Sequence, residues 1–195
     1  MIGFLDALPA PLSQRAKDFF ALWDECRRGR KLPLRSDITP EVLGSFFETC
    51  VLLELRGHDD IRVAMAGNTV NAHLGYDLTG FNYLDLTSAE NRSWRAHLTI
   101  AQAAQPCGVV IYYWLRFADG SVLPVEFCGA PYCEDGVEEA SLILCCATGL
   151  AKTDMRGLPM DPDSYEEGDG MRFIDLGFGV PPLVPSQRQA ARPVQ

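Results

Sequence analysis

The chain has 195 residues, of which 47% are apolar and 22% charged, a composition that is typical of a folded globular protein and excludes a disordered or fibrous one. Its length suits one domain with appendages rather than two domains. The net charge of −9 repels phosphate backbones and anionic lipids, apart from a basic cluster within residues 27–35, so we expect neither a nucleic-acid nor a membrane partner.

The first predicted element is a helix over residues 14–28. Ser13 is a suitable N-cap, apolar residues recur at helical spacing, and Gly29 follows the last turn. A second, short helix is predicted to begin at Thr39, with Pro40 in its first turn.

The pattern then changes to that of strands. Two apolar runs, 50–55 and 61–65, flank a polar turn and together predict a hairpin. Short helical turns are predicted over residues 68–86. A longer helix, capped by Ser88, follows them and runs to about residue 104.

Three further strands are predicted, at residues 109–117, 122–128 and 141–148. Alternation along a strand assigns its side chains to two faces, and we place Arg116 and Glu126 in solvent. The core face then holds Val109, Ile111, Tyr113, Leu115, Leu123, Val125 and Phe127. Tyr112 and Trp114 point away from this core, where they suit a protein contact.

Beyond Gly149 the composition shifts to Gly, Pro and Asp, which predicts a linker or partly disordered tail over residues 151–195. Within this tail, residues 171–180 carry enough apolar surface to dock on a folded surface. We therefore divide the chain into an N-terminal helix and linker (1–39), a core domain (40–150) and the tail.

The seven cysteines predict a reducing, cytoplasmic location. Their number is odd, several lie in apolar strand-like runs, and no Cys-x-x-Cys pair is present, so we expect buried free thiols and no metal site. The N-terminus has no basic segment ahead of its short apolar run, unlike a signal peptide.

The order of these elements resembles that of the PAS domain, an α+β fold in which a five-stranded antiparallel sheet carries helices on one face. The resemblance covers about residues 31–149. The resemblance is carried in the helical block by residues 66–80. In the sheet hairpin it is carried by residues 117–121 and 124–126. The segment Leu-Pro-x-Arg-x-Asp-x-x-Pro at 32–40 makes the chain similar to stand-alone bacterial PAS proteins.

The resemblance implies a sensory or regulatory protein rather than an enzyme. PAS domains hold small ligands between sheet and helices, often dimerise through the sheet or an N-terminal helix, and pass signals by contact. We therefore expect a homodimer that acts in trans on a signalling protein. Its N-terminal helix would lie outside the core, with Phe19 and Trp23 in the interface beside Tyr112 and Trp114. The common hydrolase, P-loop and metalloprotease motifs are absent from the sequence, which agrees with a non-enzymatic role.

The ligand-binding candidates are Trp94 and His97 on the long helix, with Tyr113, Leu115 and Phe127 on the strands. Aromatic and apolar side chains with a few polar tips are typical of small-molecule sites, but a sheet needs such residues for its packing as well. Both interpretations stay open, and the sequence does not identify a cofactor.

Two alternatives stand beside this interpretation, and a third one is disfavoured. Haem-binding PAS sensors place their proximal histidine on a helix that looks like the one bearing His97, although a helix histidine without a ligand is the plainer interpretation. His73 is a weaker candidate of the same kind. The second alternative is a scaffold without any ligand. Flavin photosensors of this fold need a reactive cysteine in the helical block, where this chain has Asn68 and Asn71 but no cysteine, so photochemistry of that type is disfavoured.

Overall fold

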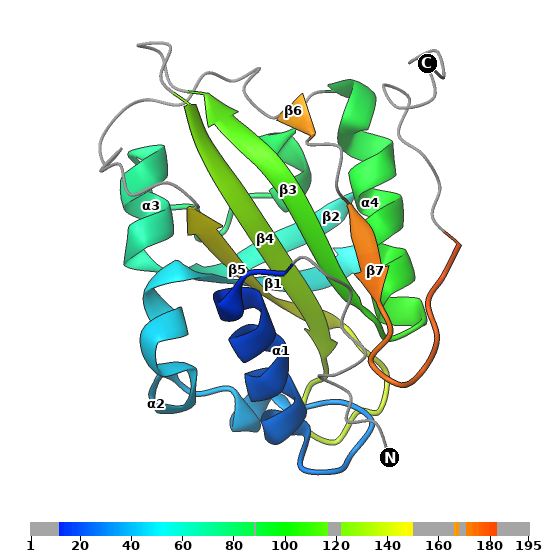
Figure 1. Cartoon of the computed structure of the whole chain (residues 1–195). Helices are drawn as coiled ribbons and strands as arrows, with labels where there is room; N and C mark the ends of the chain where they lie inside the picture. The colour runs from blue at the N-terminus through cyan, green and yellow to red at the C-terminus, as the bar shows by residue number, and fades with distance from the viewer. Residues whose placement is uncertain (1–11, 88, 117–121, 150–165, 168–170, 183–195) are drawn as a thin grey trace.

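The protein is built around one antiparallel sheet with helices on both faces, as the computed structural model in Figure 1 shows. The structure describes residues 12–87, 89–116, 122–149, 166–167 and 171–182, with the backbone alone at 113–116, 122 and 166–167. The strand order is β2-β1-β5-β4-β3-β6, and β7 pairs with β3 beside β6. The strands are β1 (Cys50–Gly57), β2 (Asp60–Ala66), β3 (Gly108–Arg116), β4 (Val122–Tyr132), β5 (Leu142–Gly149), β6 (Glu166–Glu167) and β7 (Arg172–Ile174). Strands β1 to β5 confirm the predicted five-stranded sheet.

The helices begin and end close to the predicted positions. They are α1 (Gln14–Arg27), α2 (Pro40–Leu43), α3 (Asn68–Leu74) and α4 (Ala89–Ala104), with short 3-10 turns at Arg35–Asp37 (η2), Gly44–Thr49 (η3) and Tyr83–Leu86 (η4). The Ser13 hydroxyl accepts from the Ala16 amide at 3.1 Å, which confirms the cap of α1. The predicted cap of α4, Ser88, lies outside the described residues.

Helix α1 is part of the core, and our prediction that it lies outside was wrong. It packs across β4, and Phe19 and Trp23 are each 1% exposed. The Trp23 indole donates to the Pro131 carbonyl oxygen at 2.7 Å. An apolar stripe on a helix shows that the stripe is buried, but not whether the same chain or a partner covers it. Phe19 and Trp23 are therefore not available to an interface.

Glu126 is also buried, contrary to the prediction that it faces solvent. Its side chain is on the face opposite Phe127, as alternation predicts, but α1 covers that face and leaves Glu126 1% exposed. Its carboxylate accepts from the Ser13 amide at 3.2 Å, from the Ser13 hydroxyl and from the Tyr112 hydroxyl at 2.7 Å. Burial first, and then this hydrogen bond, raise the pKa of Tyr112. Tyr112 is half-buried in this contact, and the side chain of Trp114 lies outside the described residues.

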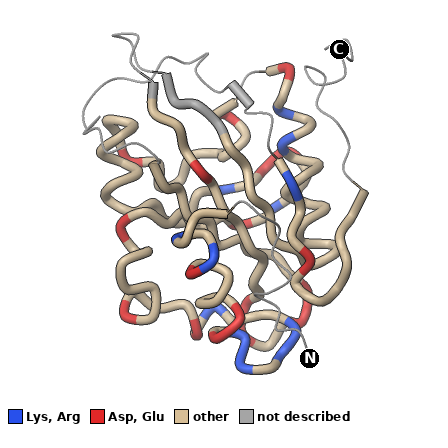
Figure 2. Tube along the Cα trace, in the orientation of Figure 1, with Lys and Arg blue, Asp and Glu red and all other residues tan. Residues whose placement is uncertain are grey.

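The basic residues after α1 surround a buried carboxylate. Figure 2 shows basic residues gathered in the loop that follows α1, and Asp37 of η2 lies there with 7% of its surface exposed. Its carboxylate pairs with Arg30 and with Arg28, the latter at 3.5 Å, and accepts from the Leu34 amide at 3.0 Å. The cluster is thus partly neutralised inside the chain, and the Leu-Pro-x-Arg-x-Asp segment is fixed to the domain.

The C-terminal segment docks on the sheet, as its apolar content predicts. Val109 of β3 lies opposite Phe173 of β7, and Ile174 and Leu176 are buried in the core beneath α1. The Asp175 carboxylate then accepts from the amides of Gly177, Phe178 and Gly179 at 2.8–2.9 Å, which closes a tight turn. Apart from β6 and residues 171–182, the predicted tail lies outside the described part of the chain.

Candidate functional site

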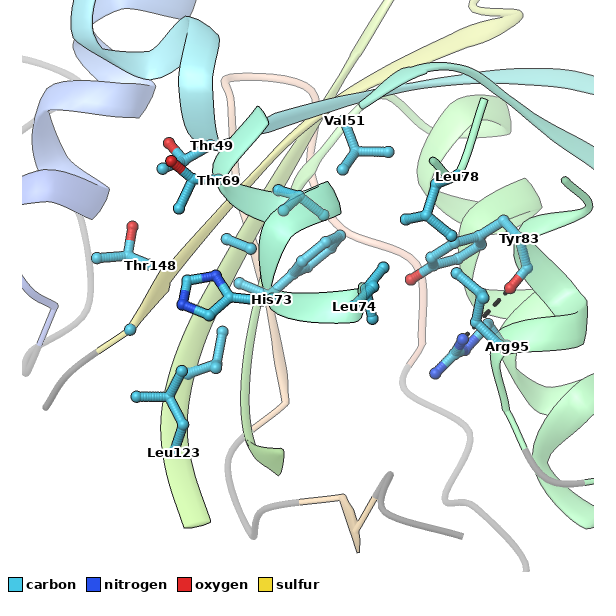
Figure 3. A pocket seen from close by; sticks show the side chains of 16 residues that line it. Thr49, Val51, Thr69, His73, Leu74, Leu78, Tyr83, Arg95, Leu123 and Thr148 are labelled. Atoms are coloured by element: carbon cyan, nitrogen blue, oxygen red, sulfur yellow. Dashed lines mark hydrogen bonds between the residues drawn. The ribbon is translucent and has the colours of Figure 1, made fainter. Parts of the chain in front are cut away.

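A cavity of about 330 Å³ lies between the sheet and α3, and we call it the site cavity. Figure 3 shows side chains from both layers converging on it. Its walls are mainly apolar and come from Val51, Val70, Leu74, Leu78, Leu86, Leu123, Val125, Phe127, Ala147 and Gly149. Its polar residues are Thr49, Thr69, His73, Tyr83, Arg95 and Thr148. Its volume and its mixture of groups are those of a small-molecule site.

Gly67 and Asn71 fix the helix that forms one wall. A Cβ atom at Gly67 would lie 2.4 Å from the Glu48 carbonyl group, so only glycine lets α3 begin this close to η3. The Asn71 side chain donates to the Ala66 carbonyl at 3.3 Å and accepts from the Leu78 amide at 3.1 Å. These bonds place Leu78, which is 3% exposed, against the cavity.

Asp77 closes the same loop. Its carboxylate accepts from the Thr79 amide at 2.9 Å and from the Asn71 amide group at 3.2 Å. The backbone hydrogen bond from Thr79, followed by the Thr79 side chain, lowers the pKa of Asp77. The loop after α3 is therefore held by side-chain hydrogen bonds as well as by the packing of Leu78.

One end of the site cavity is neutral and polar. Figure 3 shows Thr49, Thr69 and Thr148 near His73 on one side of the view. The Thr49 hydroxyl accepts from the Arg15 guanidinium at 2.9 Å and donates to the Phe46 carbonyl oxygen at 3.2 Å. Thr49 therefore joins the cavity wall to α1, on the other side of the sheet.

The opposite end holds a buried cation. Arg95 of α4 is 4% exposed, its guanidinium lies 4.8 Å from the centre of the Tyr83 ring, and it donates to the Tyr83 carbonyl oxygen at 3.4 Å. No Asp or Glu is found among the described residues that line the cavity. The described lining at this end thus carries one guanidinium group.

A second, smaller cavity of about 30 Å³ adjoins the first. Trp94, Leu98, Val109 and Cys145 line it, and Tyr83, Arg95 and Phe127 line both cavities. Its size suits a single water molecule rather than a ligand.

The five ligand-binding candidates are distributed unevenly around these cavities. Phe127 lines both and Trp94 lines the smaller one. The side chains of Tyr113 and Leu115 lie outside the described residues, but their backbones pair with Val125 and Leu123. His97 is on the exposed side of α4 and lines neither cavity.

The described residues do not support the cofactor sites considered from the sequence at the residues preferred there. His97 faces away from the site cavity and cannot be an axial haem ligand there, whereas His73, the weaker candidate, does line the cavity from α3. No cysteine is present among the described residues that line the site cavity, where a flavin adduct would have to form. Across the described ranges, no three His, Cys, Asp or Glu side chains gather in a way that could hold a metal ion.

The seven cysteines are free and buried, as predicted. Burial raises the pKa of the Cys50 and Cys107 thiols to about 12. The thiolate, which is the reactive form, is therefore suppressed at these two residues at neutral pH. Of the helices in the described part of the chain, none has the length and apolar character needed to cross a bilayer.

The chain is similar to several solved structures. A solved light-oxygen-voltage domain studied with a flavin analogue is 15% identical, with a TM-score of 0.44 over 57% of this chain and 84% of that one. The Rhodobacter sphaeroides LOV protein is 13% identical, with a TM-score of 0.40 over 73% of this chain and 70% of that one. The PAS domain of an HTR-like protein from Haloarcula marismortui is 18% identical, with a TM-score of 0.38 over 60% of this chain and 95% of that one.

These structural likenesses are too distant to indicate a ligand. No match was found among curated proteins. The family model described as "PAS domain" matches residues 12–144, which include α1, the strands β1 to β4 and the first three residues of β5. The chain belongs to the PAS domain family.

Proposed function

We propose that this is a sensory or regulatory protein that binds a small molecule in the site cavity and acts in trans on a signalling protein. The observation that carries the proposal is the site cavity itself. Close-packed protein interiors contain few voids larger than a water molecule, and this space of about 330 Å³ has polar groups at two ends. A binding role accounts for both its volume and its lining.

Helix α1 is our candidate for the element that passes the signal on. Thr49 lines the cavity, and its hydroxyl accepts from Arg15 of α1 at 2.9 Å. The Arg15 guanidinium also donates to the Ser45 carbonyl oxygen at 2.9 Å and lies 4.4 Å from the centre of the Phe46 ring. A ligand that moves Thr49 would therefore change the contacts of α1 directly.

The proposal includes a cytoplasmic location and a homodimer that binds its ligand without turning it over. The interface of such a dimer cannot use Phe19 and Trp23, because both are buried within the chain. Light scattering from the protein as it elutes from a size-exclusion column measures its mass and so tests the homodimer.

Native mass spectrometry of the full chain tests ligand binding. We expect a mass excess that disappears on denaturation. Ala147→Phe places a ring in the cavity and should remove the excess, whereas Ala104→Phe, at an exposed position, should retain it. Equal masses under both conditions, with no small molecule stabilising the protein, would favour the ligand-free scaffold.

Hydrogen exchange tests the relay to α1. When the co-purified molecule is removed and added back, we expect the exchange rates of the α1 amides to change in the wild-type protein and in Ala104→Phe, but not in Ala147→Phe. Unchanged α1 rates in all three proteins would contradict a signalling role for this helix.

A further inference from the structure

The described lining of the site cavity has one permanently charged side chain, Arg95. This residue is 4% exposed, so water screens its charge poorly and an anion placed beside it is attracted more strongly than at the surface. The planar guanidinium also matches the two oxygens of a carboxylate. The Tyr83 ring and carbonyl oxygen, at 4.8 Å and 3.4 Å, hold the group in place at the cavity wall.

The neutral polar end lies across the cavity from Arg95. In Figure 3, Thr69, His73 and Thr148 are on one side of the view, and Arg95 with Tyr83 is on the other. Hydroxyl and imidazole groups both donate and accept hydrogen bonds, so this end suits a neutral hydroxyl or carbonyl group. The leucine and valine side chains between the two ends suit an apolar body.

Resting on the proposed function, we infer that the ligand is a small amphipathic carboxylate. Its carboxylate contacts Arg95, its apolar body contacts Leu74, Val125 and Phe127, and a second, neutral polar group contacts Thr69 and His73. If each non-hydrogen atom takes at most the ~30 Å³ that a water molecule occupies, the cavity accepts a ligand of on the order of ten to twenty such atoms.

Titration calorimetry with three acid and amide pairs tests this inference. The probes are phenylacetate with phenylacetamide, 4-hydroxyphenylacetate with 4-hydroxyphenylacetamide, and octanoate with octanamide, each added to the full chain after removal of co-purified molecules. Each amide keeps the body of its acid and loses the charge. A charge-assisted hydrogen bond contributes about 1.5–3 kcal/mol, so we expect at least one acid to bind about ten- to a hundredfold more tightly than its amide.

Two variants on the same helix assign the preference to Arg95. Arg95→Met should reduce the ratio of amide Kd to acid Kd to about one, whereas Arg92→Met should leave it unchanged, because Arg92 does not line the cavity. Arg95→Lys retains the charge without the two-pronged geometry and should give an intermediate ratio. If Arg95→Met does not fold, the wild-type ratio and the Lys variant still decide the question.

Thr69→Val tests the neutral end, because valine matches threonine in size but lacks the hydroxyl. We expect it to weaken the binding of 4-hydroxyphenylacetate several-fold and to leave the binding of phenylacetate almost unchanged. Amides that bind as tightly as their acids would overturn the carboxylate inference and leave the proposed ligand-binding function intact. Binding of no probe, together with no mass excess in native spectra, would overturn both.

Discussion

One face of the sheet is covered by α1 and the other by α3 and α4, and the two layers differ in how they are filled. Beneath α1, Phe19, Phe20 and Trp23 are 0–1% exposed, and the buried Glu126 accepts three hydrogen bonds. On the other face, the layer contains the site cavity and the buried Arg95. We interpret the α1 face as the one that stabilises the fold and the α3–α4 face as the one that binds.

The largest expected effect comes from truncating a buried side chain on the α1 face of the sheet. Trp23→Ala removes a fully buried indole and its hydrogen bond to Pro131, so we expect it to lower the free energy of unfolding by about 3–5 kcal/mol. Leu74→Ala, in the cavity wall and only half-buried, should cost about 1 kcal/mol. Urea denaturation of both variants measures the difference, and equal losses would show that the two faces contribute alike.

High pH should lower the free energy of unfolding through Cys50, which is buried on the α1 face. Its thiol lies beneath α1 with a pKa of about 12, raised by burial from an ordinary 9.0. Between these two values the unfolded chain has lost this proton and the folded chain retains it, so stability falls as pH rises. The slope is about 1.4 kcal/mol per pH unit for one such thiol.

The measurement is urea denaturation at several pH values between 8 and 12. Well below pH 9 the thiol is protonated in both states and contributes no slope. Burial also raises the pKa of other thiols, among them Cys107, Cys128 and Cys145, so the wild type should lose stability more steeply than Cys50→Ala by about 1.4 kcal/mol per pH unit rather than by a fixed ratio. Identical slopes for wild type and Cys50→Ala would mean that α1 does not seal this thiol from water.

A smaller effect is expected at Glu126, which joins α1 to β3 and β4. Glu126→Gln keeps the shape but removes the charge that strengthens the bonds from Ser13 and Tyr112, so we expect a loss of about 1–3 kcal/mol. Glu138→Gln is the matched control, because Glu138 is exposed. If both variants melt like the wild type, Glu126 does not fasten α1 to the sheet.

Glu126 also shows what the sequence could and could not predict. Strand alternation correctly separates Glu126 from Phe127, and the cap at Ser13 correctly places the start of α1. Neither pattern reveals that Ser13, 113 residues away, lies over Glu126 and buries it. Local periodicity therefore predicts the elements and their faces, whereas burial of a charge depends on a long-range contact that leaves no local signal.

The candidate site is predicted less completely than the fold. Phe127 follows from its strand face, but Arg95 was missed because a charged residue on a helix is usually solvated. A signal was present, since Arg95 stands three residues before the apolar Leu98, a spacing that places both on one side of the helix. His97, which the resemblance suggests as a haem ligand, is two residues further along the helix and exposed.

The smallest expected effect is a gain in stability rather than a loss, and it concerns the α3–α4 face. Asn91 of α4 is 1% exposed, and neither side-chain polar atom has a hydrogen-bond partner within the described residues. A buried polar group without a partner costs about 1–3 kcal/mol, so Asn91→Leu, an apolar side chain of similar size, should raise the free energy of unfolding by about 1 kcal/mol. Ser93→Leu, at an exposed position of the same helix, should leave it unchanged. Urea denaturation measures both, and a destabilised Asn91→Leu would show that α4 is packed as fully as α1.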